Sequence, residues 1–320
     1  MRNELPYDLA DRLVIGIASS ALFDLIESDT VFHQEGEASY RRYQEEHLDE
    51  PLTAGAAFPF IQRLLSLNDL ATVGDPLVEV IIMSHNDPDT GLRVMRSVRH
   101  YELGITRAIF TQGQSPYTYM PVLNMSLFLS ANENDVRDAV SLGQPAGQVL
   151  ASAYTDDNSK QLRIAFDFDG VLASDESEQI FQQRGLRDFH QHETANIAIP
   201  ISPGPRHKFL SNINKIQRRE EQRTVEDENY SRRLRVSIVT ARSAPAHERA
   251  VASLKVWGVN VNDAFFLGGI DKGAIMQILQ PHIFFDDQRS HLLSTAKIVP
   301  SVHVPFGSVN KTFSQTPLLH

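Results

Sequence analysis

Two pairs of aspartates in the second half of the sequence each follow a short apolar run directly. Asp167 and Asp169 come after the run LRIAF, and Asp286 and Asp287 come after a second such run. An aspartate at a strand end can attack a phosphoryl group in line with the bond that breaks, and a carboxylate two residues on can protonate the leaving oxygen. Carboxylate oxygens also suit Mg²⁺. The first pair therefore predicts a nucleophile, Asp167, with a general acid, Asp169, and the second pair predicts a magnesium site.

Four further residues fit phosphoryl chemistry. Gly170 lets backbone N–H groups approach a phosphate closely. Thr240 ends the run SIVT and offers a hydroxyl to a phosphate oxygen, while Lys272 follows a Gly pair and can neutralise charge on the transferring group. Arg242 can reach a substrate as well. Each side chain also has a plainer interpretation: a helix cap for Thr240, a surface ion pair for Arg242 and an ordinary surface position for Lys272.

The elements that would position these residues alternate between two patterns. Three apolar runs, LRIAF, VSIV and IFF, are separated by helical patterns, which predicts a doubly wound α/β sheet. Ligands of such sheets bind at the carboxyl ends of the strands, where these polar residues fall. An insertion at about 178–235 is expected to form a small cap over the strand ends. Its residues Phe181 and Phe189 are expected to serve as packing rather than as substrate contacts.

The first half of the chain repeats this plan. Apolar, Gly and Pro positions match at a separation of 149 residues, and after one short insertion they match at 156. The matched pairs include Ile15 with Ile164, Gly36 with Gly185, Pro51 with Pro200, Gly55 with Gly204, Ser84 with Thr240 and Leu127 with Ile283. The fold class expected is therefore α/β, with two tandem, duplicated doubly wound units at 1–150 and 151–308. Residues 309–320 are expected to form a loose tail.

The two halves differ where the chemistry would lie. The corresponding positions are Asp167 and Ala18, Asp169 and Ser20, Lys272 and Pro116, Asp286 and Ser130, and Asp287 and Ala131. Only the second half is therefore expected to be catalytic. The first half offers serines at the matching positions without acids that would repel a phosphate. Two roles stay open for it: binding a nucleotide effector without hydrolysing it, or acting as a packing partner.

Composition narrows the class of protein. The 320 residues carry 30 Lys and Arg against 40 Asp and Glu, a formal charge of −10, which disfavours nucleic acid polymers and anionic membranes as partners. No cysteine is present, so disulfides and thiolate chemistry are excluded. The start MRNELPYDLADRL lacks the apolar run of a signal peptide, and no stretch reaches the ~20 apolar residues of a membrane helix. A cytoplasmic location is expected.

The order of the motifs, acid pair, hydroxyl, lysine and acid pair, resembles the four motifs of the haloacid dehalogenase superfamily. The strings FDFDGVLASDESE, VTARSAPA and PHIFFDDQ, with SHNDPDTGLRV and LFLSANENDV in the first half, are similar to the cytosolic 5′-nucleotidase type I family. The resemblance covers almost the whole chain. One departure is Phe168, because the family tends to have Gly between the two aspartates.

The resemblance implies magnesium-dependent hydrolysis of nucleoside 5′-monophosphates, AMP prominent among them. In this reading Asp167 is the nucleophile and Asp169 is the general acid and then the general base. Thr240 and Lys272 hold the phosphate. The metal is held by Asp167, the backbone carbonyl of Asp169 and Asp286, with or without Asp287.

Other functions remain open from the residues alone. One is a phosphatase for sugar phosphates or another small ester, and another is a nucleotide-binding regulator that has lost turnover. A second copy of the chain is also open as a partner. The sequence indicates neither the base nor the sugar that a nucleotide substrate would carry.

Overall fold

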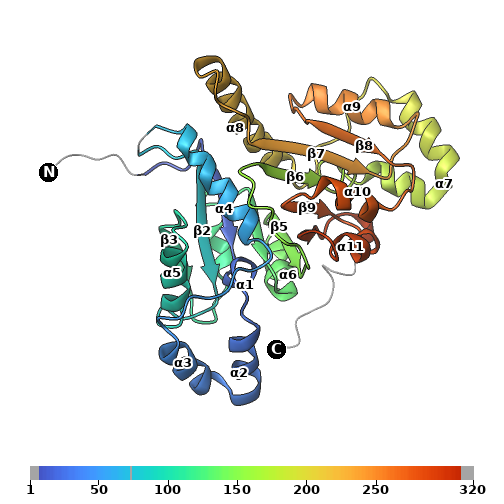
Figure 1. The fold of residues 1–320 in the computed structure, drawn as a ribbon. Helices are drawn as coiled ribbons and strands as arrows, with labels where there is room; N and C mark the ends of the chain where they lie inside the picture. Colours follow the sequence, from blue (N-terminus) through green and yellow to red (C-terminus); the bar gives the residue numbers. More distant parts are fainter. Residues whose placement is uncertain (1–6, 73, 311–320) are drawn as a thin grey trace.

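The computed structural model describes residues 7–72 and 74–310, and within them the strands form one ten-stranded sheet (Figure 1). The strands of the first half are β1 (Leu13–Ile17), β2 (Val78–Ser84), β3 (Arg107–Phe110), β4 (Leu127–Ser130) and β5 (Ala146–Leu150). The strands of the second half are β6 (Leu162–Phe166), β7 (Leu234–Thr240), β8 (Asp263–Phe266), β9 (Ile283–Asp286) and β10 (Ser301–His303). Residues 311–320 of the predicted tail lie outside the described residues.

The two halves of the sheet have the same internal strand order. From its outer edge the first half runs β3-β2-β1-β4-β5, and from the opposite edge the second half runs β8-β7-β6-β9-β10. All neighbours within a half pair in parallel, and only β5 and β10, which join the halves, pair antiparallel. The predicted α/β class with a largely parallel sheet is confirmed.

One row of paired residues crosses the join between the halves. Ser130 pairs with Gln148, Gln148 with His303, and His303 with Asp286. β4 and β9 run in opposite directions, and each of them ends at its own member of this row, Ser130 for β4 and Asp286 for β9. The strand end of the first half and that of the second half are therefore separated by only two strands, β5 and β10.

Helices cover both faces of the sheet, which explains why its strands are apolar along most of their length. The helices of the first half are α1 (Ser19–Leu22), α2 (Ile26–Glu35), α3 (Glu37–Glu46), α4 (Phe58–Ser66), α5 (Gly91–His100) and α6 (Glu133–Ser141), with 3₁₀ turns η1 (Leu67–Leu70) and η2 (Pro116–Tyr119). Those of the second half are α7 (Glu176–Ala195), α8 (His207–Glu226), α9 (His247–Val256), α10 (Lys272–Leu279) and α11 (Arg289–Thr295), with η3 (Ser308–Asn310).

The largest of the three apolar clusters among the described residues extends through both halves. It includes Ile15 and Leu64 from the first half and Phe166, Phe209 and Phe285 from the second. Helix α4 of the first half contacts β6, and helix α8 of the second half contacts β1. Each half therefore supplies a helix that packs under the strands of the other.

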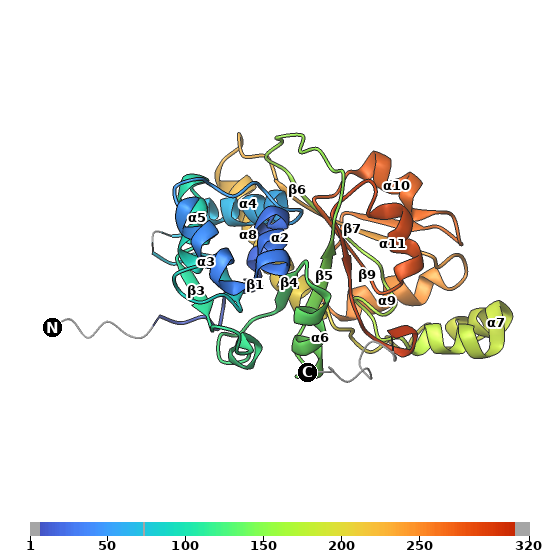
Figure 2. The ribbon, with the colours of Figure 1, turned by 90° about the horizontal axis from the view of Figure 1, so that it is seen from below.

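The segment predicted to form a cap separates into two parts. Helix α8 buries Phe209, Leu210 and Ile213 in the main core instead of lying over the strand ends. Helix α7 lies at the periphery of the second half, next to α9 (Figure 2). Its chain is kinked at Gly185, where φ is 81°, and Gly36 between α2 and α3 has φ 83°. Both positions use the left-handed backbone that glycine adopts without strain.

Crossing a bilayer takes a long apolar helix, and none of the helices in residues 7–72 and 74–310 combines that length with that apolar character.

Candidate active site

Three predicted site residues lie at the carboxyl ends of neighbouring strands. Asp167 follows β6, which pairs with β7 on one side and with β9 on the other. Thr240 ends β7 and Asp286 ends β9. The backbone N–H of Asp167 donates to Phe285 O at 2.7 Å, so β6 and β9 remain paired up to the acids. All three side chains are buried, as expected for groups held rigidly at strand ends.

Lys272 bridges the two acids. Its Nζ lies 3.1 Å from Asp167 Oδ2 and 2.7 Å from Asp286 Oδ2. It is the first residue of α10, and the preceding Asp271 caps that helix by accepting the N–H of Gly273 at 2.9 Å. Lys272 is only 3% exposed, so the surface interpretation was wrong. Burial lowers its pKa, but the two carboxylates raise the pKa more strongly and hold the ammonium charged.

The strand ends contain more buried carboxyl groups than Lys272 alone can keep ionised. Burial raises the pKa of Asp167 to about 6, and burial together with Asp167 and Asp286 raises the pKa of Asp287 to about 9. Asp286 is the exception, because Lys272 and His291 outweigh burial and lower its pKa. Oδ1 of Asp287 has no hydrogen-bond partner among the described residues. Buried carboxylates of this kind require a compensating charge, and their oxygens suit a divalent cation such as Mg²⁺.

One neighbour of the acids was missed from the sequence. His291 on α11 places Nδ1 3.2 Å from Asp286 Oδ2, and ligand atoms of Asp167, Asp286 and His291 all lie within 4.8 Å of one another. Carboxylate oxygens are the ligands that Mg²⁺ prefers, whereas imidazole is favoured by transition metals. The position was detectable, because the corresponding residue of the first half is the acid Asp135.

Asp169 is held by Arg242. The guanidinium donates from Nε to Oδ2 and from Nη2 to Oδ1, both at 2.7 Å, and Nη1 contacts Glu193 on α7. Arg242 is only 4% exposed, so it does not form the surface ion pair that was the plainer interpretation. Burial by itself lowers the pKa of Arg242, but the carboxylates of Asp169 and Glu193 raise it by more, so the pKa lies above its ordinary value. Glu193 itself is fully buried, and the sequence patterns did not single it out.

A cavity of about 260 Å³ opens over these residues. Its lining combines the strand-end groups with residues of α7 and two loops, namely Asp167, Asp169, Thr240, Arg242, Glu178, Phe181, Phe189, His190, Gly268, Gly269 and Gln288. Phe181 is 43% exposed and stands edge-on to Phe189, at 6.1 Å between ring centroids. Both rings line the cavity, and Phe189 is also buried against Phe181, so the expectation of packing for these rings stays a prediction.

The backbone around the first two acids fits tightly. Gly170 has φ 71°, and a Cβ at this position would collide with the carboxylate of Asp287, so glycine is required here. Phe168 is fully buried and stacks on Trp257 at 5.9 Å. The departure from the family pattern therefore adds an apolar contact to the core and leaves the carboxylates in place.

The matching strand ends of the first half carry a different network. Ser130 donates to Asp135 Oδ2 at 2.6 Å, and Nε2 of His85 lies 3.0 Å from the hydroxyl of Tyr117. Tyr117 is 1% exposed and fills the interior beside these groups. Burial raises the pKa of Asp135. The expectation that the first half has no acid at this place was wrong, because Asp135 on α6 folds back against Ser130.

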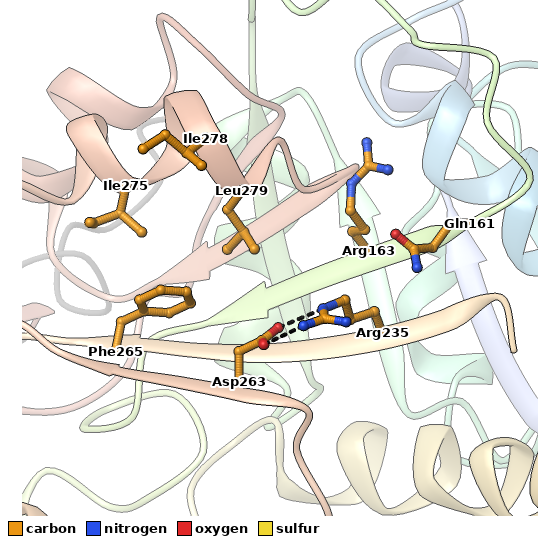
Figure 3. A pocket seen from close by; sticks show the side chains of 8 residues that line it. All are labelled: Gln161, Arg163, Arg235, Asp263, Phe265, Ile275, Ile278 and Leu279. Atoms are coloured by element: carbon orange, nitrogen blue, oxygen red, sulfur yellow. Dashed lines mark hydrogen bonds and ion pairs between the residues drawn. The ribbon is translucent and has the colours of Figure 1, made fainter.

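A second cavity, of about 310 Å³, lies away from these groups (Figure 3). It adjoins Arg163 and Arg235 near the amino ends of β6 and β7, whereas Asp167 follows the carboxyl end of β6. Arg235 is engaged by Asp263 through two hydrogen bonds, and apolar side chains of α10 form the other wall. Nothing in this cavity resembles a nucleophile with a neighbouring acid.

Comparison with known proteins places the chain in a family. A model of the 5′-nucleotidase family matches residues 5–311. The human protein named cytosolic 5′-nucleotidase 1B is 33% identical over 314 residues, which cover 94% of this chain and 50% of that protein. The chain thus spans about half the length of this relative. The search of solved structures found no match. With a family match that covers nearly the whole sequence, the chain belongs to the 5′-nucleotidase family.

Proposed function

We propose that the chain is a magnesium-dependent 5′-nucleotidase that hydrolyses nucleoside 5′-monophosphates such as AMP. The observation that carries the proposal is the convergence of Asp167, Thr240, Lys272 and Asp286 at one edge of the sheet, beside an open cavity. Family membership and the name of the human relative support the same activity.

In the proposed mechanism Asp167 attacks the phosphorus atom. Its Oδ1 accepts the N–H of Phe168 at 2.7 Å and its Oδ2 faces Lys272, so the carboxylate is held in one orientation. A bond forms between Asp167 and phosphorus while the bond from phosphorus to the 5′ oxygen breaks. Asp169, which takes up a proton when the substrate binds, gives that proton to the 5′ oxygen. Water then attacks the aspartyl phosphate, Asp169 takes a proton from the water, and inorganic phosphate leaves.

Phosphate recognition falls to Thr240, Lys272 and the backbone at Gly170, and Arg242 lines the same cavity. The proposed metal ligands are Asp167, Asp286, Asp287 and the backbone carbonyl of Asp169. When bound, Mg²⁺ would offset the buried acids and the charge of the phosphate. The unpartnered oxygen of Asp287 supports a cation at this place.

For the nucleoside we propose the side of the cavity formed by α7. Phe181, Phe189 and His190 line it, and aromatic faces are suited to stacking on a nucleobase. These residues belong to the part of the predicted cap that lies by the strand ends, so α7 is the proposed cap.

We also propose that the two halves are duplicated haloacid-dehalogenase-like units, at 1–150 and 151–308, of which only the second is catalytic. Their identical strand order and the paired glycines Gly36 and Gly185 support this. A nucleotide effector in the first half stays a prediction, and the carboxylate of Asp135 counts against a phosphate beside Ser130. The cytoplasmic location and self-association stay predictions as well.

A phosphate-release screen of the purified protein tests the proposal. The substrates are AMP, IMP, CMP, UMP and two sugar phosphates, each with Mg²⁺ and with EDTA. We expect release from at least one nucleoside monophosphate, with no release in EDTA. Turnover of sugar phosphates alone would overturn the substrate class, and no turnover of any ester would overturn the enzymatic role.

A further inference from the structure

Glu193 is a fully buried carboxylate with three hydrogen-bond partners among the described residues. It contacts Arg242 Nη1, accepts from Arg249 Nη1 at 2.9 Å and accepts from Ser177 Oγ at 2.9 Å. Burial raises its pKa, but the two guanidinium groups outweigh burial and lower it, so Glu193 is ionised. It belongs to α7, while Arg242 follows β7.

Arg242 connects Glu193 to Asp169 with little freedom. Its Nε and Nη2 hold both oxygens of Asp169, and Nη1 also donates to Ala246 O at 3.1 Å. Its guanidinium carbon lies 5.1 Å from the ring centroid of Phe168 and 5.4 Å from that of Phe189. All of its nitrogens are engaged, so the direction of the Asp169 carboxyl depends on where Glu193 holds Arg242.

The first half contains a natural comparison for this network. Gln44 corresponds to Glu193, and Arg93 corresponds to Arg249. Arg93 Nη1 donates to Gln44 Oε1 at 3.3 Å, and Arg93 Nε donates to a backbone carbonyl, as Arg249 Nε does at the matching place. The residue matching Arg242 is the neutral Asn86. In the first half an amide is therefore enough to hold the arginine. A carboxylate occurs at this position only in the half that also has Arg242.

We propose that Glu193 is a positioning residue for leaving-group departure, which fixes the Asp169 carboxyl through Arg242 and so makes α7 part of that step. The inference rests on the proposed function. A purely structural alternative is that Glu193 only ties α7 to α9 through Arg249.

Two substrates whose leaving groups differ in how much they need a proton can distinguish the positioning role of Glu193 from the purely structural one. A nucleoside alkoxide needs a proton from Asp169 as the bond to phosphorus breaks, whereas p-nitrophenolate leaves readily without one. The test measures kcat/KM, which reports the steps up to leaving-group departure, for AMP and for p-nitrophenyl phosphate in wild type and in Glu193→Gln. Substrates that the screen identifies as better than AMP replace it.

For Glu193→Gln we expect kcat/KM for the nucleotide to fall about 10-fold, a part of what a general acid contributes, and kcat/KM for p-nitrophenyl phosphate to change by less than about 2-fold. The matched control is Glu176→Gln. Glu176 binds the same Arg249, at 2.8 Å, but it has no contact with Arg242, so both substrates should keep wild-type values.

An equal loss for both substrates in Glu193→Gln, or the same loss in Glu176→Gln, would overturn the positioning role. Unchanged kcat/KM for both would do so too. The folded amount is checked by thermal unfolding, and Glu193→Asp serves as a second variant, because its shorter carboxylate cannot span both arginines. If wild type turns over neither substrate, the proposed function fails instead, and the two failures are thus distinguishable.

Discussion

The two halves of the sheet share their strand order but differ in the charge at their strand ends. The second half buries Asp167, Asp286 and Asp287 around Lys272, whereas the first half closes the same place with Ser130, Asp135, His85 and Tyr117. The strand order therefore does not require the acids. Because buried carboxylates that lack full compensation are costly, the cluster around Lys272 supports the chemistry proposed for the second half.

The largest effect should come from the nucleophile. Asp167→Asn replaces the attacking oxygen by an amide, and we expect phosphate release to fall at least about 10³-fold. The position that matches Asp167 in the first half is already Ala18, so the control is Ser20→Ala, at the position that matches Asp169; it should stay within about 2-fold of wild type. Phosphate release by both variants, at equal folded concentration, checks the prediction. Activity retained in Asp167→Asn, or lost in Ser20→Ala, would contradict the proposal that only the second half is catalytic.

Next in size is the loss of the buried lysine. Lys272→Met leaves Asp167 and Asp286 without their cation, so we expect kcat/KM to fall about 10²-fold. The same change removes one partner of a buried ion pair and should cost about 3 kcal/mol of unfolding free energy without metal. Urea unfolding in EDTA measures the second quantity. A variant as stable as wild type would show that the bridging ammonium contributes nothing.

A smaller effect is expected from the metal. Mg²⁺ at 100 times its dissociation constant should stabilise the wild-type protein by about 2.7 kcal/mol. In Asp286→Asn the acid at the end of β9 is lost, and we expect this stabilisation to disappear. Ser130→Ala changes the matching residue of the first half and should leave it intact. Thermal unfolding with and without Mg²⁺ decides between a site in the second half and a site elsewhere.

The last comparison concerns the pH dependence of stability and His282, whose counterpart in the first half is Ser126. Burial, with Arg63 and Arg163, lowers the pKa of His282 to about 3. The unfolded chain therefore binds a proton from about pH 6.5 downward while the folded chain does not, so acid weakens the fold by up to about 1.4 kcal/mol per pH unit. His282→Asn can still accept the N–H of Arg163 and should flatten this slope. Ser126→Ala should not.

The sequence predicted the strand ends well, because each acid pair directly follows an apolar run. Parallel pairing of β6 with β9 then places Asp167 beside Asp286 without further information. The burial of Lys272 and Arg242 was not predictable in the same way. Long cationic side chains are usually exposed, and their partners come from strands and helices far away in the chain.

Residues on helices were harder to place than residues on strands. Glu193 and His291 are brought to the strand ends by the packing of α7 and α11, which depends on tertiary structure rather than on local pattern. Comparing the halves position by position would have flagged both, since they face Gln44 and Asp135. The core position of α8 was also visible in advance, because Phe209, Ile213 and Ile216 recur at helical spacing.

The antiparallel pair β5 and β10 has a consequence for any attempt to produce one half alone. In the whole chain each of these strands pairs with the open edge of the other. Helix α4 of the first half also contacts β6 of the second half, and helix α8 of the second half contacts β1 of the first. A fragment ending near residue 155 would leave β5 with an unpaired row of amides and carbonyls, which is a template for pairing with another fragment. Such fragments should aggregate or recombine, and the chain should unfold as one cooperative body.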